Sequence, residues 1–212
     1  SECLVGSEMC IRDRYVTYND YHELCSYKLG FHAEYTTDKK LLEGLAGLSE
    51  KYHAPVYTHN SETKREVEEC RQRYGKSPTQ LFEEMGLYRY GGGGYHCIWF
   101  DDEDIDIFAK RNLSVVTNPA SNLKLASGIA PLKKMQEAGI NLAIGTDGPA
   151  SNNCLDMFRE MFLVTGLAKL REHDAAVMDA NDVLYMATTG GAKAMGCLLY
   201  TSDAADDLTR VD

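Results

Sequence analysis

Residues able to bind a metal ion stand at or near the ends of several short apolar runs of this chain. His59 ends the run "PVYTH" and precedes Glu62 by three residues, His96 lies in "YHCIWF", and Asp147 ends "NLAIGTD". Imidazole nitrogen and carboxylate oxygen are common ligands of divalent cations such as Zn²⁺, and such a cation turns water into a nucleophile. The pattern therefore points to a hydrolytic metal site whose ligands come from separate strands.

Five apolar or β-branched runs alternate with amphipathic stretches along the chain. The predicted strands are residues 29–33, 55–59, 95–100, 113–118 and 141–147. The predicted helices include residues 38–52, 102–111, 155–170 and 181–195. This alternation predicts an α/β fold with a parallel sheet. Loops that follow parallel strands converge on one face of a (β/α) barrel, which would bring together His32, His59, His96, Asn118 and Asp147.

Two details of these elements follow from side-chain type. The helix 155–170 is expected to turn its apolar residues toward the core, namely Phe158, Met161, Phe162 and Ala168. The run "GGGG" at 91–94 is expected to form a tight loop that enters the strand 95–100, because glycine tolerates turn conformations.

The composition excludes several classes of protein. With 212 residues, 44% of them apolar, the chain is large enough to bury a core. A net charge of −10 and scattered basic residues argue against nucleic-acid binding. There is no run of about 18 apolar residues and no basic segment followed by an apolar one, so we expect no membrane span and a cytoplasmic location. Seven cysteines without a C-x-x-C pair fit neither a zinc ribbon nor a disulfide scaffold.

The two ends of the chain are related at the level of DNA. "MCIRD", residues 9–13, can be encoded by atgtgtataagagac, and "CLLYT", residues 197–201, by tgtctcttatacaca, and these overlap as reverse complements. Both ends resemble translated transposon-based sequencing adapters. We therefore predict that residues 1–14 and 197–212 are adapter-derived artefacts around a barrel segment of residues 15–196.

Four motifs together resemble the amidohydrolase superfamily, and within it the branch of methylthioadenosine and S-adenosylhomocysteine deaminases that also contains triazine chlorohydrolases. The motifs are "THNSE", "YHCIW", "NPASNLKLASGIAP" and "GTDGPASNN", and the resemblance runs from Gly30 to Gly196. The combination of "SNLKLASG" with "GTDGPASNN" is its specific part. The resemblance implies a mononuclear metal hydrolase on a distorted (β/α)₈ TIM barrel, of which this chain would supply strands four to eight.

The resemblance also implies a role for each motif residue. His59 and Asp147 would bind one divalent metal ion, Zn²⁺ or Fe²⁺, and Asp147 would also take a proton from the attacking water. Glu62 would protonate a purine ring nitrogen, and His96 would orient the water and assist proton transfer. The expected substrate-binding residues are His32, Glu62, Asn118, Ser121 and Asn122.

Several of these residues have a structural alternative. Glu62 could instead cap a helix that begins within residues 60–61, and Asp147 could be a turn residue. Loop closure by hydrogen bonds, which would shape the wall of the site, is the alternative role of Asn118, Ser121 and Asn122.

The metal site implied by the resemblance is incomplete in this chain. In the superfamily two further histidines, spaced His-x-His, come from the first strand, and the sequence contains no such pair. One histidine and one aspartate would hold a cation weakly compared with three or four ligands. We therefore expect an N-terminally truncated fragment that is catalytically inactive as written, with an exposed sheet edge and poor solubility.

Three functions are compatible with these observations. The first is a metal-dependent hydrolytic deaminase acting on C–N bonds of cyclic amidines, with a purine nucleoside of the methylthioadenosine or S-adenosylhomocysteine type as its small-molecule substrate. The second is the same barrel acting on guanine, oxidised guanine or a chlorotriazine ring. The third is a non-catalytic, metal-free barrel, against which the joint presence of His59, Glu62, His96 and Asp147 argues. A homo-oligomer is compatible with the sequence, which does not determine the oligomeric state.

Overall fold

The computed structural model describes residues 7–22 and 25–197. Residues 1–6 of the first adapter-like end and residues 198–212 of the second lie outside the described residues. Helix α2 (Ser7–Tyr18) packs beside helix α3 (Lys39–Tyr52), and the rings of Tyr15 and Tyr52 are 4.7 Å apart. The assignment of both ends to adapter sequence stays a prediction. Within the described ranges, no helix has the length and apolar character needed to cross a membrane.

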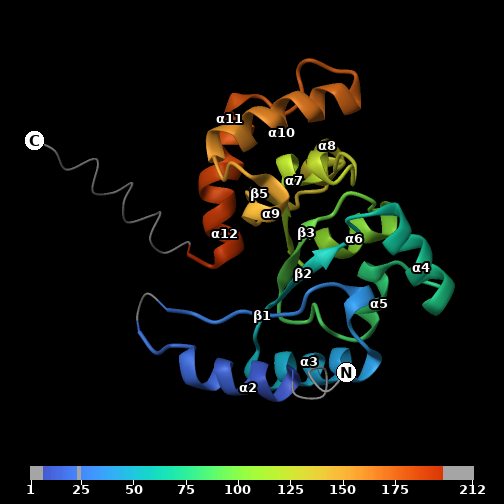
Figure 1. The fold of residues 1–212 in the computed structure, drawn as a ribbon, viewed down its shortest axis with the longest axis vertical. Coiled ribbons are helices and arrows are strands. Elements are labelled where there is room, and N and C mark those ends of the chain that lie inside the picture. Colours follow the sequence, from blue (N-terminus) through green and yellow to red (C-terminus); the bar gives the residue numbers. More distant parts are fainter. Residues whose placement is uncertain (1–6, 23–24, 198–212) are drawn as a thin grey trace, which may run out of the picture.

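One parallel sheet of five strands in chain order forms the centre of the fold, as predicted (Figure 1). The strands are β1 (Leu29–Gly30), β2 (Val56–Asn60), β3 (Gly92–His96), β4 (Ser114–Thr117) and β5 (Asn141–Ile144). Each strand pairs in parallel with the next one along the chain. Because all five strands point the same way, their carboxyl ends share one edge of the sheet, which is where the predicted site residues stand.

The predicted strand 95–100 is wrong, because β3 begins three residues earlier and ends four residues earlier. Three of the four glycines therefore lie inside the sheet and not in a loop before it. The neighbouring backbone explains their type, since a Cβ atom on Gly92 would lie 1.9 Å from the carbonyl oxygen of Val56. The shift makes His96 the last residue of its strand.

The helices begin and end close to the predicted positions where capping residues mark them. The predicted helices 38–52 and 102–111 correspond to α3 and α6 (Asp102–Lys110), whose N-caps Asp38 and Asp101 accept hydrogen bonds from the first turn. The remaining helical elements are η1 (Glu34–Thr36), α4 (Lys64–Tyr74), α5 (Pro78–Glu84), α7 (Pro119–Lys124), α8 (Leu132–Glu137), α9 (Pro149–Asn152), α10 (Met157–Glu172), α11 (Ala180–Tyr185), η2 (Met186–Gly190) and α12 (Gly191–Met195).

Helix α10 turns a different face inward than predicted. Phe158 and Phe162 are 82% and 75% exposed, whereas Glu160, Val164 and Ala168 are buried on one side of the helix. The carboxylate of Glu160 accepts hydrogen bonds from the segments that follow β4 and β5. The prediction from apolar type was right for Ala168 and wrong for both phenylalanines, because a buried acidic residue fixes the orientation of this helix.

The two faces of the sheet have different surroundings. One face packs against helices and contributes to the buried core, which includes Leu45, Phe108 and Leu142. The other face lines an open cavity of about 500 Å³ with residues that include Tyr57 and Tyr95. Helices α2 and α3 lie at the β1 end of the sheet (Figure 1). Helix α12 contacts β4 and β5 and contributes Ala194 and Met195 to the lining of this cavity. The chain therefore has the architecture of a partial barrel, covered outside and open inside.

Candidate functional site

Four predicted site residues lie together beyond the carboxyl ends of the strands, and a fifth lies beside them. The rings of His59 and His96 are 5.4 Å apart between centroids and inclined by only 20°. The Nε2 atom of His96 lies 3.9 Å from Oε2 of Glu62, and the protonated form of His96 would lower the pKa of Asp147. The ring of His32 lies 4.6 Å from that of His59. The structure thus places imidazoles and carboxylates from β1, β2, β3 and β5 in one cluster.

His59 is oriented by the main chain of the loop after β1. Its Nδ1 lies 2.6 Å from the carbonyl oxygen of His32, which also accepts hydrogen bonds from the His59 amide (3.0 Å) and the Thr58 hydroxyl (3.1 Å). A carbonyl oxygen can only accept, so Nδ1 of His59 carries the proton and Nε2 presents its lone pair. This tautomer is the one that a metal-binding histidine adopts when its other nitrogen bonds a carbonyl group.

His32 itself stands at the exposed side of the cluster. Partial burial lowers the pKa of His32, the nearby ring of His59 lowers it further, and the charge of Glu62 acts in the opposite direction. The net effect is a pKa below the usual value for histidine, so that the neutral ring is favoured at neutral pH.

His96 is held by an amide side chain from α7. The residue is 1% exposed, and its backbone has a left-handed conformation with φ of 68°. Its Nδ1 lies 2.6 Å from Oδ1 of Asn122. Because that amide oxygen only accepts, Nδ1 of His96 donates and Nε2 is left toward Glu62. Asn122 therefore sets both the orientation and the tautomer of His96.

Glu62 lies between β2 and α4 and does not cap the helix. The N-cap is Thr63, and the carboxylate of Glu66 accepts hydrogen bonds from the amides of Ser61 (3.2 Å) and Glu62 (2.8 Å). The capping alternative for Glu62 is therefore wrong. Its own carboxylate accepts a hydrogen bond of 3.0 Å from the hydroxyl of Ser127. The Glu62 side chain is thus available to the site.

Asp147 follows β5 in a left-handed backbone conformation with φ of 60°. Its Oδ2 accepts a hydrogen bond of 2.6 Å from the Ser121 hydroxyl, and its Oδ1 accepts one of 2.6 Å from the Gly148 amide. Burial raises the pKa of Asp147, but hydrogen bonds from Ser121, Gly148 and Ser151, together with the charge of His96, bring it below the ordinary value. The site therefore favours the ionised carboxylate.

The three remaining predicted substrate-binding residues are buried, with exposures of 4% for Asn118, 0% for Ser121 and 2% for Asn122. Ser121 and Asn122 bond Asp147 and His96, whereas the Asn118 amide lies 3.4 Å from the Val116 carbonyl oxygen. Their polar atoms are directed at other protein groups. Contact with a substrate stays a prediction for all three.

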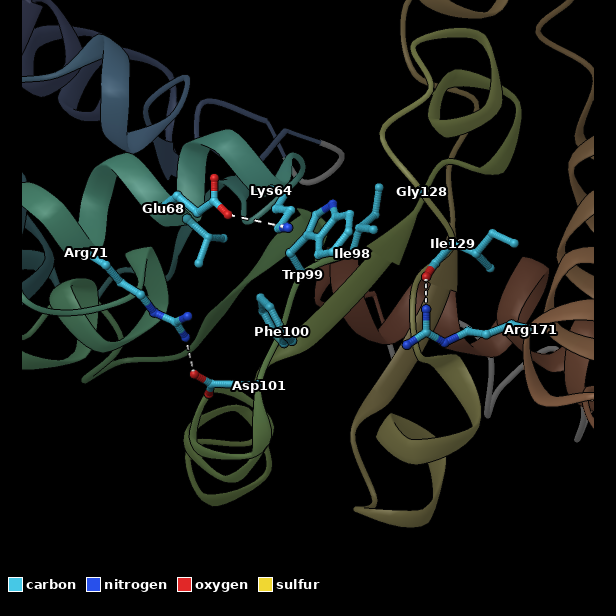
Figure 2. Close-up of a pocket in the computed structure, with 11 residues that line it drawn as sticks. Lys64, Glu68, Arg71, Ile98, Trp99, Phe100, Asp101, Gly128, Ile129 and Arg171 are labelled. Carbon is cyan, nitrogen blue, oxygen red and sulfur yellow. Dashed lines mark hydrogen bonds and ion pairs between the residues drawn. The ribbon is translucent and has the colours of Figure 1, made fainter.

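Sequence reasoning missed Ser127 and Trp99, which join Glu62 to a neighbouring cavity. The Ser127 carbonyl oxygen accepts a hydrogen bond of 2.8 Å from the Trp99 indole. Trp99 lines a cavity of about 420 Å³ between α4 and the segment containing Gly128 and Ile129 (Figure 2). None of the predicted site residues lines this cavity, so it is separate from the cluster. Ser127 lies within the motif "SNLKLASG", which could have singled it out.

The two candidate metal ligands fit a divalent cation in chemical type but not in number. His59 offers a free imidazole nitrogen and Asp147 a carboxylate, and both are donors that Zn²⁺ accepts. Within residues 7–22 and 25–197, no group of three or more His, Cys, Asp or Glu side chains could hold a metal ion. A three- or four-ligand site would therefore need donors besides those of the described residues.

A parallel α/β partial barrel with histidines and carboxylates at its strand ends is the architecture of metal-dependent hydrolases built on (β/α) barrels. The chain belongs to the amidohydrolase family, whose family model matches residues 14–198. The matched range includes all five strands and every predicted site residue.

Curated proteins resemble this chain over most of its length. It is 43% identical over 173 residues to 5-methylthioadenosine/S-adenosylhomocysteine deaminase of Pyrococcus furiosus, covering 82% of this chain and 41% of that protein. It is 41% identical over 168 residues to 5'-deoxyadenosine deaminase of Methanothermobacter thermautotrophicus, covering 79% of this chain and 39% of that protein. The chain thus spans about two fifths of the length of the curated relatives it matches.

Solved structures show the same fold. An adenosine deaminase from Xanthomonas campestris with bound zinc has a TM-score of 0.84 and 37% identity, covering 90% of this chain and 43% of that one. Atrazine chlorohydrolase from Arthrobacter aurescens has a TM-score of 0.80 and 22% identity, covering 89% and 42%, and supports the fold alone. The deaminases of Pyrococcus furiosus, Methanothermobacter thermautotrophicus and Xanthomonas campestris are thus 37–43% identical to this chain.

Proposed function

We propose that the complete protein to which this chain belongs is a metal-dependent hydrolytic deaminase of purine nucleosides of the methylthioadenosine or S-adenosylhomocysteine type. The observation that carries the proposal is the cluster of His59, Glu62, His96 and Asp147 in an amidohydrolase chain. Identities of 41–43% to two proteins named as deaminases favour ammonia over chloride as the leaving group. The fold alone does not choose between them.

His59 and Asp147 would hold the metal ion, through the free Nε2 atom of the first and the carboxylate of the second. The amidohydrolase match and the zinc-containing relative favour Zn²⁺, while the donor set also suits Fe²⁺. When bound, a divalent cation makes water a nucleophile at neutral pH by lowering the pKa of that water to about 7.

Glu62 would act as the acid of the reaction. Attack of water at C6 of an adenine ring pushes electrons onto N1, and a proton placed there prevents the build-up of negative charge. The carboxyl group of Glu62 would deliver that proton, with the Ser127 hydroxyl bond holding the side chain in place. The remaining hydroxyl proton on C6 returns to Glu62 as the 6-oxo product forms.

Asp147 and His96 would handle the attacking water. The Asp147 carboxylate, ionised in this environment, takes one proton from the water and passes it to the amino group, which leaves as ammonia. His96, with its Nδ1 committed to Asn122, directs Nε2 toward the reacting oxygen. The exposed ring of His32 would face the purine. Substrate contacts by Asn118, Ser121 and Asn122 belong to the same proposal, and the bonds of the last two also support an orienting role.

The test has two stages, because the chain spans about two fifths of its relatives. Sequencing of the native locus across both ends of this chain would establish the complete gene, which we expect to encode a His-x-His strand upstream. A native frame that begins and ends as this sequence does would contradict the proposal, because the metal site would then lack ligands.

The protein encoded by the complete gene is then assayed for ammonia release from 5'-methylthioadenosine. Glu62→Gln should lower kcat by about 10²–10⁴-fold, the usual contribution of a general acid, and leave metal content unchanged. Glu68→Gln is the matched control, because Glu68 lies on α4 with an exposed side chain. Full activity in Glu62→Gln would contradict the assignment of the acid.

A further inference from the structure

Glu160 on α10 is a fully buried carboxylate with no part in the proposed chemistry. Its exposure is 0%, and within the described residues no lysine or arginine forms an ion pair with it. A buried charge without a partner is costly, so its oxygens must be satisfied by hydrogen-bond donors. The identity of those donors shows what the residue does.

Two donors from two different segments bind the carboxylate. The amide of Ala120, at the start of α7, donates to Oε2 at 3.0 Å. The side-chain amide of Asn152, at the end of α9, donates to Oε1 at 2.7 Å. One carboxylate therefore joins the segment that follows β4 to the segment that follows β5.

The same two segments meet again at the proposed catalytic aspartate. Ala120 precedes Ser121, whose hydroxyl donates to Asp147 at 2.6 Å. Asn152 donates a second hydrogen bond, of 2.6 Å, to the carbonyl oxygen of Thr146, the residue before Asp147. Glu160 is thus linked to Ser121 through Ala120, and to Asp147 through Asn152 and Thr146.

We infer that Glu160 is a positioning residue that holds the Ser121 and Asp147 segments together and so fixes the direction of the Asp147 carboxylate. The inference rests on the proposed function of Asp147. Asp147 has a left-handed backbone that costs free energy and persists only where surrounding contacts impose it. The Glu160 bonds supply that constraint from outside the site, without contact with substrate or metal.

The chemistry of the two donors requires a carboxylate and not an amide. Both Ala120 and Asn152 present N–H groups to Glu160, and a carboxylate offers an acceptor oxygen to each. A glutamine offers one oxygen and one NH₂ group, so Glu160→Gln would leave one donor facing another. The substitution keeps the size of the side chain and removes only its ability to accept a hydrogen bond from each of the two donors.

The experiment uses the protein encoded by the complete gene and four forms of it, namely the wild type, Glu160→Gln, Ser121→Ala and the double variant. The Zn²⁺ dissociation constant is measured by competition with a chelator. We expect each single variant to raise it about tenfold, as for other residues that orient a metal ligand, and the double variant to raise it no further. Glu172→Gln, on the same helix but partly exposed, is the matched control and should leave it unchanged.

A purely structural role predicts a different outcome. If Glu160 only stabilises the fold, the two effects on the dissociation constant should multiply or be absent, while the melting temperature falls. A change below twofold in Glu160→Gln, or multiplied effects in the double variant, overturns the inference. If Glu160→Gln fails to fold, Glu160→Asp is measured in its place, because the shorter carboxylate cannot reach both donors while Asn152 and its bond to Thr146 are left unchanged.

A crystal structure of metal-free Glu160→Gln separates this inference from the proposed function. We expect the distance between Ser121 Oγ and Asp147 Oδ2 to exceed hydrogen-bonding range, and a distance still near 2.6 Å overturns the inference. This readout requires neither metal nor turnover. Absence of zinc binding or of deamination in the wild type would therefore contradict the proposed function and leave the test of Glu160 intact.

Discussion

The two sides of the site are built differently. On the side of β3 to β5, side chains orient side chains: Asn122 bonds His96 and Ser121 bonds Asp147. His96, Ser121 and Asn122 are buried, and Asp147 is half-buried. On the side of β1 and β2, the orienting group for His59 is a main-chain carbonyl, and the rings stand half-buried or exposed. We refer to these as the β3–β5 side and the β1–β2 side.

The two sides should differ in their sensitivity to amino-acid substitution. A side chain that orients another can be lost in one substitution, and the buried partner is then left unsatisfied. A main-chain carbonyl is present whatever residue occupies the position, and that of His32 accepts from three donors at once. We therefore expect substitutions of the orienting residues to have larger effects on the β3–β5 side than around the His32 carbonyl group on the β1–β2 side.

The largest effect is expected for Asp147→Asn in the protein encoded by the complete gene. The substitution removes both a metal-binding oxygen and the group that accepts a proton, so kcat should fall by at least about 10³-fold. Metal content, measured by elemental analysis, should fall with it, in contrast to Glu62→Gln. Retention of stoichiometric metal in Asp147→Asn would show that this carboxylate is not a ligand.

An intermediate effect is expected for Asn122→Ala. The Nδ1 donor of buried His96 would lose its acceptor, which should lower kcat about 10–100-fold and the free energy of unfolding by about 1–3 kcal/mol. Steady-state kinetics and urea unfolding measure the two quantities. Asn181→Ala, at an exposed position of α11, is the control. Unchanged kinetics in Asn122→Ala would contradict the expectation that the β3–β5 side is sensitive to substitution of its orienting residues.

The smallest effect is expected for Thr58→Val, which removes one of the three donors to the His32 carbonyl oxygen without changing side-chain volume. The His59 amide and Nδ1 remain bonded, so the free energy of unfolding should fall by no more than about 1 kcal/mol. The Zn²⁺ dissociation constant should stay within about threefold of the wild-type value, since His59 keeps its tautomer. A loss of zinc affinity as large as that of Asn122→Ala would erase the contrast between the two sides.

The sequence was sufficient for the features that depend on periodic or capping residues. The five parallel strands in chain order follow from apolar runs that alternate with helical patterns, and Asp38 and Asp101 mark the helix starts. It also selected the residues that the structure brings together, because loops after parallel strands share one edge.

The remaining features depend on partners that are distant in the sequence. The start of β3 was missed because Gly92 has no side chain to signal a strand, and only the nearby backbone of Val56 explains it. The inward face of α10 differs from the prediction because it carries the buried, hydrogen-bonded Glu160, whereas Phe158 and Phe162 are exposed. Distant hydrogen bonds of this kind have no local pattern, and propensity rules do not reveal them.

The left-handed backbone at Asp147 has a consequence for protein engineering. Such a conformation costs a residue other than glycine of order 1 kcal/mol, and glycine at this half-buried position would remove that cost together with a group of the site. A library selected for heat resistance alone would therefore not reject glycine there, although the variant is inactive. Selection for thermal robustness of this protein therefore needs an activity screen beside it.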